Sequence, residues 1–366
     1  MSVVIFIIIL LVLVLVHEFG HFFTAKKFGI RVDEFGFGFP PKIFGIKKGE
    51  TTYSLNLLPI GGFVKIFGEN PNEENTNGPD ASRSFVNKPK WQQAIVLFAG
   101  VAMNFLLAWV LFSIGFMSGL PTSVGSEPAG SKLTDVNLTV VSVSEKSPAF
   151  LVGLKTGDKI VTIASNDDYI LDLNPETLKS FVLSHSNKKI NLGYIRGQDK
   201  VFHSAVVTPI VDRGDTEPRI GISMDMIGTA RLPFLSAFIE GTRLNWFITK
   251  STAIGLFTLV RDSLHGKGNL ASVAGPVGMV SIVGDAYQFG FVYLLSFAAL
   301  ISINLAIINL LPFPALDGGR LLFLLIEKIK GSRLNPKYAN TANTIGFSIL
   351  ILLMVVITWH DVVKLF

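Results

Sequence analysis

The residues best suited to chemistry lie near the N-terminus, where His17, Glu18 and His21 form an HExxH pattern. On a helix, two histidines at this spacing project from one face and can share a metal ion. The glutamate beside the first histidine lies close enough to act as a base. Because three fixed residues in five recur by chance, the surroundings of the pattern decide what it means.

The surroundings of this pattern are apolar. Residues 3–16 contain only Val, Ile, Leu and Phe, with no basic residue before them and no small-residue cleavage site after them, so we expect a retained helix. Extended to Phe28, this helix can cross about 30 Å of hydrocarbon. His17 then lies roughly 21 Å along the helix from Val3. Ionisable groups at such a depth are costly unless they face a cavity, a partner or a metal, so a functional site is expected.

A single carboxylate near the other end of the chain is the predicted third ligand. Asp317 lies in the stretch NLLPFPALDGGR (309–320). The prolines break a helix and the glycines allow close turns, so we expect Asp317 on a non-helical segment that is buried in protein or lies beside water. If the spans before His21 and before Asp317 both run inwards, the ligands meet on the same cytoplasmic side.

Two histidines and one carboxylate leave a fourth tetrahedral position for water, as in catalytic zinc sites. The chain has no cysteine, so thiolate ligands and thiol catalysis are excluded. Zinc lowers the pKa of a bound water towards ~7 and polarises a carbonyl, while Glu18 can take the proton and deliver it to a leaving amine. Asn309 can hydrogen-bond a substrate or its oxyanion; an amide that only binds backbone groups freed by the prolines is an equal alternative.

Composition places the chain among membrane proteins. Its 366 residues have a mean hydropathy of +0.50, and only 16% are charged. The net charge of +5 is modest and the basic residues cluster beside apolar runs, so we expect a lipid bilayer and no nucleic acid as a partner. The predicted fold class is a polytopic α-helical membrane protein. About four transmembrane helices are expected, at 1–28, 91–119, 288–311 and 343–366.

Basic residues indicate the orientation. The loops after the first and third predicted spans are rich in Lys and Arg, so the positive-inside rule makes both loops cytoplasmic and both termini external. The predicted parts are the first half of a membrane core at 1–120, an extracytoplasmic domain at 121–230, an amphipathic interfacial region at 231–287 and the second half of the core at 288–366. A fifth span within 231–265 is the alternative, but it would bury Lys250 at a cost of roughly 3 kcal/mol.

Residues 121–230 predict an inserted β-rich domain, because apolar and polar residues alternate between turns of Gly, Asn and Asp. The stretch SPAFLVGLKTGDKI (147–160) resembles the characteristic segment of bacterial PDZ domains. Such a domain can bind an extended peptide or chain end along a sheet edge. A rigid cap that binds nothing is the alternative.

The first cytoplasmic loop is unusually apolar. Residues 51–67 predict two short strands around Pro59, Gly61 and Gly62. Bare strand edges cannot lie in lipid, so we expect a re-entrant β-hairpin that is covered by protein or lines a cavity. Residues 70–82, rich in Asn, Glu, Pro and Ser, are predicted to be a mobile connector.

Together these motifs resemble the site-2 protease family of M50-type intramembrane zinc metalloproteases, specifically its bacterial RseP-like branch with a single PDZ domain. The resemblance rests on HExxH in the first span, NLLPFPALDGG near the end of the third and the PDZ-like domain between spans. It covers nearly the whole chain. It implies that His17, His21 and Asp317 bind Zn²⁺ and that Glu18 is the catalytic base.

The resemblance also implies a substrate class and a location. Residues 51–67 are similar to a hairpin that holds the substrate extended, which makes Pro59, Gly61, Gly62 and Asn309 candidates for substrate binding. Family members are endopeptidases of the bacterial plasma membrane that cut single-span membrane proteins, such as anti-sigma factors and signal-peptide remnants, near the cytoplasmic side. They commonly act after a first extracytoplasmic cut, with the PDZ region viewed as a size filter. The chain departs from its better-known relatives in having one PDZ-like unit instead of two.

Two other functions are weighed against a protease. A divalent metal transporter would also place His and Asp in the membrane, but it predicts further polar residues along the spans, and the second and fourth spans offer few. A catalytically inactive PDZ scaffold predicts loss of a ligand or of the base, yet HExxH and Asp317 are intact. The remaining histidines, at 185, 203, 265 and 360, are predicted to be solvated. No oligomeric state or natural substrate follows from the sequence.

Overall fold

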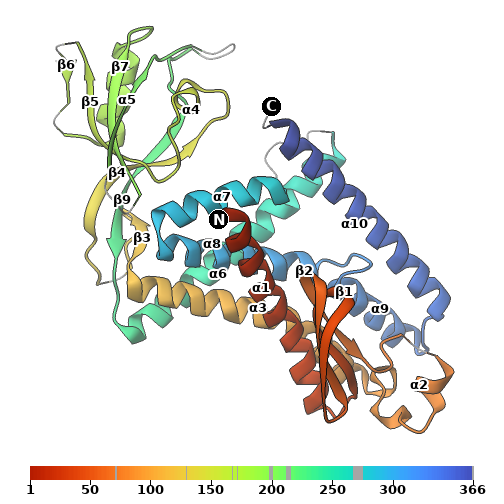
Figure 1. The fold of residues 1–366 in the computed structure, drawn as a ribbon. Helices are drawn as coiled ribbons and strands as arrows, with labels where there is room; N and C mark the ends of the chain where they lie inside the picture. The colour runs from red at the N-terminus through yellow and green to blue at the C-terminus, as the bar shows by residue number, and fades with distance from the viewer. Residues whose placement is uncertain are drawn as a thin grey trace. The chain divides into compact units, whose positions relative to one another are not determined.

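The protein is described by a computed structural model that covers every residue except 71, 129, 167, 171, 198–200, 212–215, 267–274, 365 and 366. Within this part of the chain, four helices are long and apolar enough to cross a membrane, which confirms the predicted fold class. They are α1 (Ser2–Lys27), α3 (Lys90–Ser118), α8 (Phe291–Leu310) and α10 (Pro336–Lys364) (Figure 1). The end of the predicted fourth span, 365 and 366, lies outside the described residues.

The largest boundary difference is at α10, which begins at Pro336 rather than at 343. Residues 336–342 are mostly polar, so hydropathy excludes them from a span. Proline is nevertheless favoured at the first helical position, because its fixed φ suits the helix and its missing N–H is not needed there. Hydropathy therefore locates the apolar part of this helix and misses its polar first turns.

The chain forms two compact units. The first consists of Met1–Phe112, Gly241–Val283 and Phe297–Phe366, and it contains all the predicted metal ligands. The second consists of Ser113–Glu240 and Gly284–Ser296, and it contains the β-rich domain.

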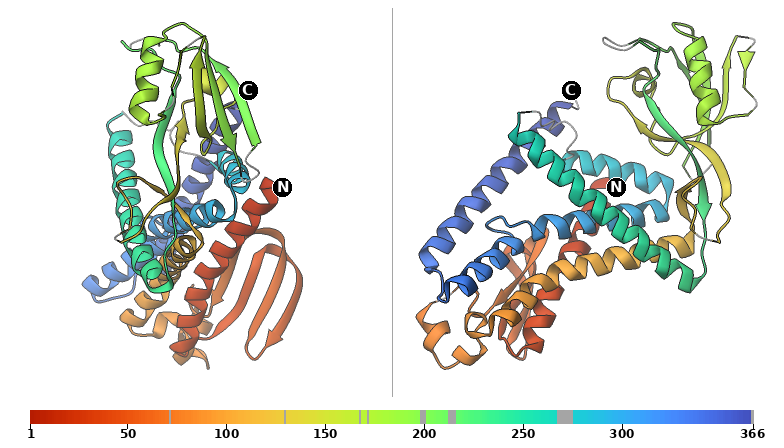
Figure 2. Two further views of the ribbon diagram at one scale, coloured as in Figure 1. Left: turned by 90° about the vertical axis from the view of Figure 1, so that its left-hand side faces the viewer. Right: turned by 180° about the vertical axis from the view of Figure 1, so that it is seen from behind.

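In the first unit, β1 (Val32–Lys48) and β2 (Thr51–Ile66) form a sheet in which both strands bend near their middle. Glu34 consequently lies opposite two residues, Lys65 and Thr52. Four extended segments lie side by side in the order 62–66, 32–39, 51–58 and 42–48 (Figure 2). The strands predicted within 51–67 are present, but they do not pair with each other as a hairpin, because the first part of β1 lies between them.

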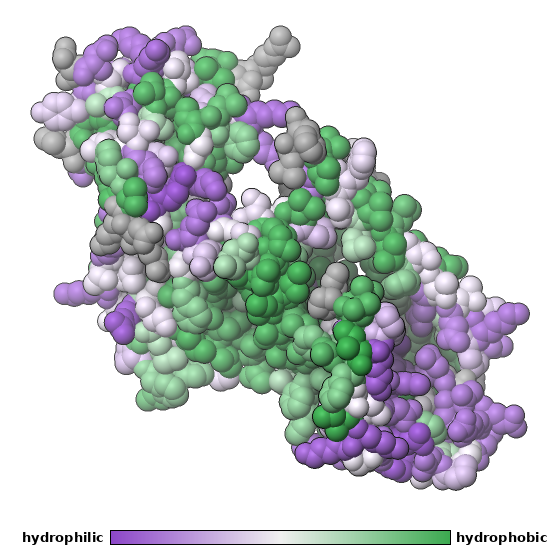
Figure 3. Space-filling view, in the orientation of Figure 1, coloured by the Kyte–Doolittle hydropathy of each residue, from purple (hydrophilic) through white to green (hydrophobic). Residues whose placement is uncertain are grey.

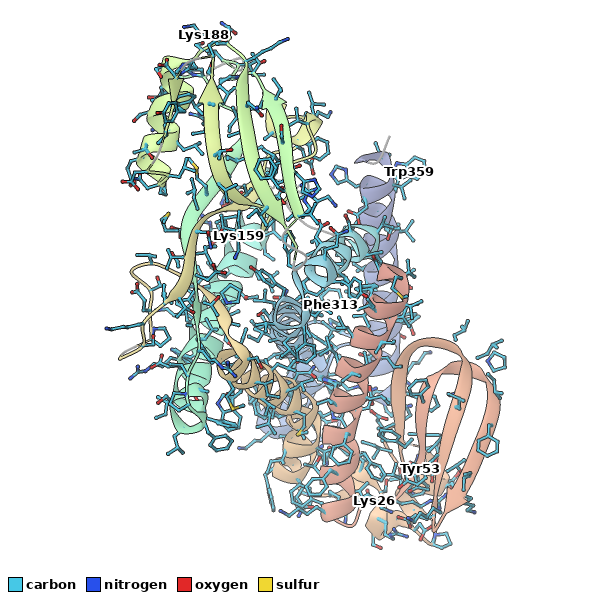
Figure 4. The ribbon with its side chains drawn as sticks, turned by 60° about the vertical axis from the view of Figure 1, so that its left-hand side comes forward. Lys26, Tyr53, Lys159, Lys188, Phe313 and Trp359 are labelled. Atoms are coloured by element: carbon cyan, nitrogen blue, oxygen red, sulfur yellow. The ribbon has the colours of Figure 1, made fainter. Side chains whose placement is uncertain are left out.

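Aromatic and apolar side chains hold this sheet against α1. The Phe22 ring meets the rings of Phe35 and Tyr53 edge-on, with centroids 5.3 and 6.0 Å apart, and Tyr53 is labelled in Figure 4. A buried cluster beside them consists of Ala25, Ile30, Val32, Ile66, Phe85, Val96 and Leu97. Burying a large apolar side chain is worth roughly 1.5–3 kcal/mol, so this cluster fastens the sheet to α1 and α3.

The second unit contains a seven-stranded sheet with the order β3-β9-β4-β5-β7-β8, and β6 pairs with β5. The strands are β3 (Leu120–Ser123), β4 (Thr134–Val143), β5 (Lys159–Ser165), β6 (Asp168–Tyr169), β7 (Ile190–Arg196), β8 (Val201–Val207) and β9 (Ile222–Ala230). The helices α4 (Pro148–Leu151) and α5 (Pro175–Ser184) accompany the sheet. Its core includes Leu138, Ile160, Ile163, Leu178, Ile190 and Leu192. The predicted β-rich region is therefore confirmed, and its likeness to PDZ domains stays a prediction.

Three further helices are α6 (Phe234–Leu264), α7 (Pro276–Phe289) and α9 (Asp317–Lys330). In the described part of the chain, α6 is not among the helices that satisfy the criteria for a span, although it is long enough to cross a membrane. Its placement in the membrane interface stays a prediction.

Figure 3 shows apolar side chains over the spanning helices and hydrophilic ones gathered around α2 (Glu73–Asn77).

One smaller prediction is incomplete and another is wrong. Residues 70–82, of which 71 lies outside the described residues, contain the short helix α2, whose first turn is capped by Asn72 and Asn75 through reciprocal hydrogen bonds of 2.8 Å, and the mobility of this connector stays a prediction. His185 was expected to be solvated, but it is only 7% exposed and its ring stacks on Phe181 at a centroid distance of 4.1 Å. Polar composition concealed a capped helix in one case and a core histidine in the other.

Candidate active site

The site begins with the contact between α1 and α3, where glycine is needed on both helices. A Cβ added to Gly20 would lie 2.4 Å from the carbonyl oxygen of Ala99, and one added to Gly100 would lie 2.3 Å from His21 Nε2. Such distances are far below van der Waals contact, so any larger residue would push the helices apart or displace the imidazole. His17 and His21 lie on this face of α1, and each is 7% exposed.

Three potential ligand atoms converge beside this contact. His17 Nε2 and His21 Nε2 lie 3.1 Å apart, and they lie 3.1 and 3.3 Å from Asp317 Oδ2. Oδ2 is buried and has no hydrogen-bond partner among the described residues. Tetrahedral ligands bound to zinc at 2.0–2.1 Å lie about 3.3–3.4 Å from one another. The donor types, their spacing and the orphaned carboxylate oxygen therefore fit a zinc ion.

The turn between α8 and α9 presents the carboxylate. It leaves the helix after Leu310 and includes Phe313, which is labelled in Figure 4. Ala315 in this turn has a φ of +76°, a left-handed conformation that is unfavourable for a residue with a Cβ. Its N–H donates a hydrogen bond of 3.1 Å to Asn343 Oδ1 from α10. A span that carries no ligand thus supports the turn that leads to Asp317.

Asp317 was expected on a non-helical segment, but it is the first residue of α9. A carboxylate is favourable in the first turn of a helix, where the backbone N–H groups point towards it. The two following glycines serve close packing: a Cβ on Gly318 would lie 2.3 Å from the Leu310 carbonyl oxygen, and one on Gly319 would lie 2.1 Å from that of Phe313. Only glycine lets the start of α9 lie this close to the end of α8.

The ligands line a cavity of about 400 Å³, and the base and amide predicted from the sequence line it too. Its lining residues are Val14, His17, Glu18, His21, Phe63, Val64, Ile66, Glu69, Leu97, Leu305, Asn309, Ala315, Leu316, Asp317 and Arg320. Val64 lines the cavity together with Glu18, and its backbone lies beside the Glu18 carboxylate. One wall of the cavity is therefore the outer segment of the β1–β2 sheet.

The other predicted residues lie at or near this wall. A Cβ on Gly62 would lie 3.6 Å from Glu18 Cγ, which places Gly62 beside the base. Gly61 has a φ of +101°, which favours glycine at this bend of β2. Pro59 lies in β2, and its side chain is outside the described part of the structure.

Sequence reasoning missed two charged residues of the cavity. Arg320 of α9 forms an ion pair with Glu69, which follows β2. This pair joins the loop after the sheet to the helix that begins with Asp317. The arginine next to the predicted ligand stretch was a usable signal, but nothing in the sequence pointed to its partner 251 residues away.

Fold and cavity together define a multi-pass membrane protein in which two histidines and an aspartate form a candidate metal site beside a glutamate. The profile of peptidase family M50 matches residues 5–353. The chain belongs to this family, and it is a zinc metalloprotease. The predicted resemblance to the site-2 protease family is thereby confirmed.

Individual relatives match along their whole length. The regulator of sigma-W protease RasP from Bacillus subtilis is 32% identical over 447 residues, which cover 100% of this chain and 99% of that protein. The zinc metalloprotease RasP from Bacillus licheniformis is 32% identical over 449 residues, with the same coverage of 100% and 99%. The crystal structure of a PDZ domain from an SdrC-like protein of Listeria monocytogenes is 23% identical, covers 25% of this chain and 92% of its own, and has a TM-score of 0.20.

Proposed function

We propose that the protein is an intramembrane endopeptidase in which His17, His21 and Asp317 bind zinc and Glu18 is the catalytic base. The observation that carries the proposal is the position of Glu18. It lies in one cavity with the three ligand atoms, beside a β-sheet segment, on a helix long and apolar enough to span a membrane. A glutamate so placed has a use in peptide hydrolysis and none in binding a metal that it does not touch.

The residues of the cavity divide the reaction between them. Zinc, when bound, supplies a Lewis acid that lowers the pKa of water and polarises a peptide carbonyl. Glu18 takes a proton from the attacking water and delivers it to the leaving amine. Asn309 lines the same cavity, and its amide can donate a hydrogen bond to the carbonyl oxygen as negative charge develops there.

The sheet segment 62–66 is the proposed binding site for the substrate backbone. A helical peptide bond is shielded by its own hydrogen bonds, so a transmembrane substrate must unwind before water can attack. Among the described residues, 62–66 pairs only with the first part of β1, so its other edge has no strand beside it. An extended peptide can add to such an edge through main-chain hydrogen bonds. Gly61 and Gly62 have no side chain and would let the two backbones approach closely. Pro59 stays a predicted substrate-binding residue.

The substrates we propose are single-span membrane proteins, including proteins like anti-sigma factors and signal-peptide remnants, usually after a first extracytoplasmic cut. The name of the Bacillus subtilis relative, regulator of sigma-W protease, supports this class. The positive-inside rule supports an orientation with the active site near the cytoplasmic side and the PDZ-like region outside. The bilayer of a bacterial plasma membrane is then the solvent for both enzyme and substrate.

The test uses the full-length protein in lipid nanodiscs with a single-span substrate whose outer domain has been trimmed. Wild type should shorten the substrate on a gel, and a zinc chelator should abolish cleavage until zinc is restored. Glu18→Gln should lower the rate by about 10²–10⁴-fold, because it removes general acid–base catalysis. Glu73→Gln, an exposed change in α2, is the matched control and should leave the rate unchanged.

Zinc content of the same samples separates the possible failures. Glu18→Gln should retain zinc, whereas His17→Ala should lose it. Equal cleavage by wild type and Glu18→Gln would disprove the assigned base. Absence of cleavage by a zinc-loaded wild type, tested on several trimmed substrates, would instead favour metal transport or a scaffold.

A further inference from the structure

One face of α3 contacts both histidines of the proposed metal centre. Val96, Gly100 and Asn104 follow one another at intervals of four residues, so they lie on one side of the helix. In the described structure, α3 contributes no residue to the candidate ligand cluster. The helix therefore acts on the ligands and does not bind the metal.

The backbone of α3 sets the state of His21. His21 Nδ1 lies 2.8 Å from the carbonyl oxygen of Val96, which can only accept a hydrogen bond. A neutral imidazole that carries its proton on Nδ1 has a free lone pair on Nε2. His21 Nε2 is the atom that faces Asp317 and His17. The carbonyl of Val96 thus prepares the correct nitrogen for a metal.

Asn104 stands in the equivalent position for His17. Its Nδ2 lies 3.2 Å from His17 Nδ1, and the residue is 0% exposed. Its Oδ1 is buried and has no hydrogen-bond partner among the described residues. A half turn of the carboxamide exchanges these two atoms and places an acceptor against His17 Nδ1. This rotation pairs the buried oxygen with the Nδ1–H of His17, moves the amide N–H groups to the position that the oxygen leaves, and keeps His17 Nε2 free for a metal.

A third span holds Asn104 in place. Ser302 of α8 is 0% exposed, and its hydroxyl donates a hydrogen bond of 2.8 Å to the backbone carbonyl oxygen of Asn104. This bond fixes the backbone from which the Asn104 side chain reaches His17. A buried polar side chain inside a membrane protein is costly unless it is paired, so a carboxamide at this position indicates a specific purpose.

We propose that Asn104 is a positioning residue whose carboxamide oxygen accepts a hydrogen bond from Nδ1–H of His17 and so directs His17 Nε2 towards the zinc. This inference rests on the metal centre of the proposed function. Hydrogen-bond partners of ligating histidines fix both tautomer and ring orientation, and their loss typically weakens metal binding by about 10–100-fold. Asn104 itself touches neither substrate nor metal.

The test measures zinc affinity of the full-length protein by competition with a chromogenic chelator. Asn104→Leu, similar in size but unable to accept a proton, should weaken zinc binding by about 10–100-fold. Asn104→Asp, which retains an acceptor oxygen, should restore the affinity to within a few-fold of wild type. The visible spectrum of the Co²⁺-substituted protein should change for Asn104→Leu and stay close to wild type for Asn104→Asp.

Asn245→Leu is the matched control. Like Asn104, Asn245 of α6 has a buried Oδ1 without a partner among the described residues. Its Nδ2 donates a hydrogen bond of 3.4 Å to the carbonyl oxygen of Phe105 in α3. It contacts no histidine in the described hydrogen bonds, so its zinc affinity should equal that of wild type. Size-exclusion profiles would verify that each variant is folded.

The outcomes separate this inference from the metal centre on which it rests. If wild type binds zinc and His17→Ala does not, the metal centre stands. Equal affinities for Asn104→Leu and Asn245→Leu would then overturn the role of Asn104, as would equal losses in Asn104→Leu and Asn104→Asp, which would indicate packing alone. If His17→Ala left the zinc content unchanged, the metal centre itself would fall and the inference with it.

Discussion

At the scale of single residues, volume matters as much as chemistry in this site. A Cβ on Gly100 would lie 2.3 Å from His21 Nε2 and 2.9 Å from His17 Cε1. Among the described glycines, only Gly100 would bring a Cβ this close to both imidazoles. A hydrogen atom at this position is therefore part of the ligand geometry. Without a side chain at this position, both imidazoles keep the places from which they can bind a metal.

Gly100→Ala should abolish tight zinc binding while the helices still form. One added methyl group would displace an imidazole by more than a packed interior can absorb, so we expect zinc affinity and proteolysis to fall by more than about tenfold. Chelator competition and substrate cleavage measure these two effects.

Gly255→Ala in α6 is the matched control for this change, because nothing lies within 4 Å of the Cβ it would add. It should leave both quantities unchanged and stabilise the helix by up to about 1 kcal/mol. Zinc affinity in Gly100→Ala equal to that of Gly255→Ala would show that the histidines have more room than the structure gives them.

The residues that the sequence predicted are those with local signals. His17 and His21 share one helical face with Glu18 next to them, and Asp317 lies between helix breakers at the end of an apolar run, so spacing and topology predicted that these residues meet. Asn104 carries no such signal. Its role depends on which face of α3 meets α1, a tertiary contact that hydropathy does not encode.

At the scale of elements, the structure divides the site between a packed pair of helices and a supported turn. The ligands on α1 are held by α3, whereas Asp317 follows a turn in which Ala315 adopts a left-handed conformation. A non-glycine residue in this conformation costs of order 1–3 kcal/mol and persists only where neighbours enforce it. The hydrogen bond that Ala315 N–H donates to Asn343 Oδ1 stabilises this left-handed conformation.

Asn343→Ala should therefore loosen the turn. Loss of one hydrogen bond, about 1 kcal/mol, should lower activity by roughly fivefold, and Ala315→Gly in the same chain should recover part of it by removing the strain. Initial rates on the trimmed substrate test both statements. Asn340→Ala, one turn earlier on α10 and exposed, should behave like wild type; a loss as large as that of Asn343→Ala would point to α10 in general rather than to this bond.

Element types were easier to predict than element pairings. Apolar length gave α1, α3, α8 and α10 within a few residues, except at the polar start of α10. The order of the β1–β2 sheet could not be obtained in this way, since alternation shows that a segment is extended and not which segment lies beside it. Insertion of 32–39 between the two halves of β2 is decided by long-range packing against Phe22 and its neighbours.

At the scale of the whole molecule, the β-rich domain is an insertion whose ends meet. The Leu232 N–H donates a hydrogen bond of 3.0 Å to the Phe116 carbonyl oxygen, and Arg231 Nε donates one of 3.2 Å to Met117. Adjacent ends allow a domain to be removed without stretching the rest of the chain. The helices on either side, α3 and α6, can then be joined directly.

Replacement of residues 120–230 by a short Gly-Ser linker should preserve zinc binding and cleavage of the trimmed substrate. If the domain excludes bulky partners, the shortened protein should also cut a substrate whose outer domain is intact, which wild type should leave uncut. Paired gels of both substrates measure this. Loss of trimmed-substrate cleavage with zinc retained would show that the domain takes part in binding and does not merely exclude.

The boundary between the two compact units falls inside helices and not in loops. It lies within α3, α6, α7 and α8. In α8, residues 291–296 belong to the second unit, whereas 297–310 belong to the unit that holds the candidate metal ligands. The same helix ends at Leu310, one residue after Asn309 and directly before the turn that leads to Asp317. A truncation placed at these unit boundaries would therefore sever four helices, one of which leads to the candidate site, so fragments of this protein are better cut within the β-rich insertion than at the edges of the units.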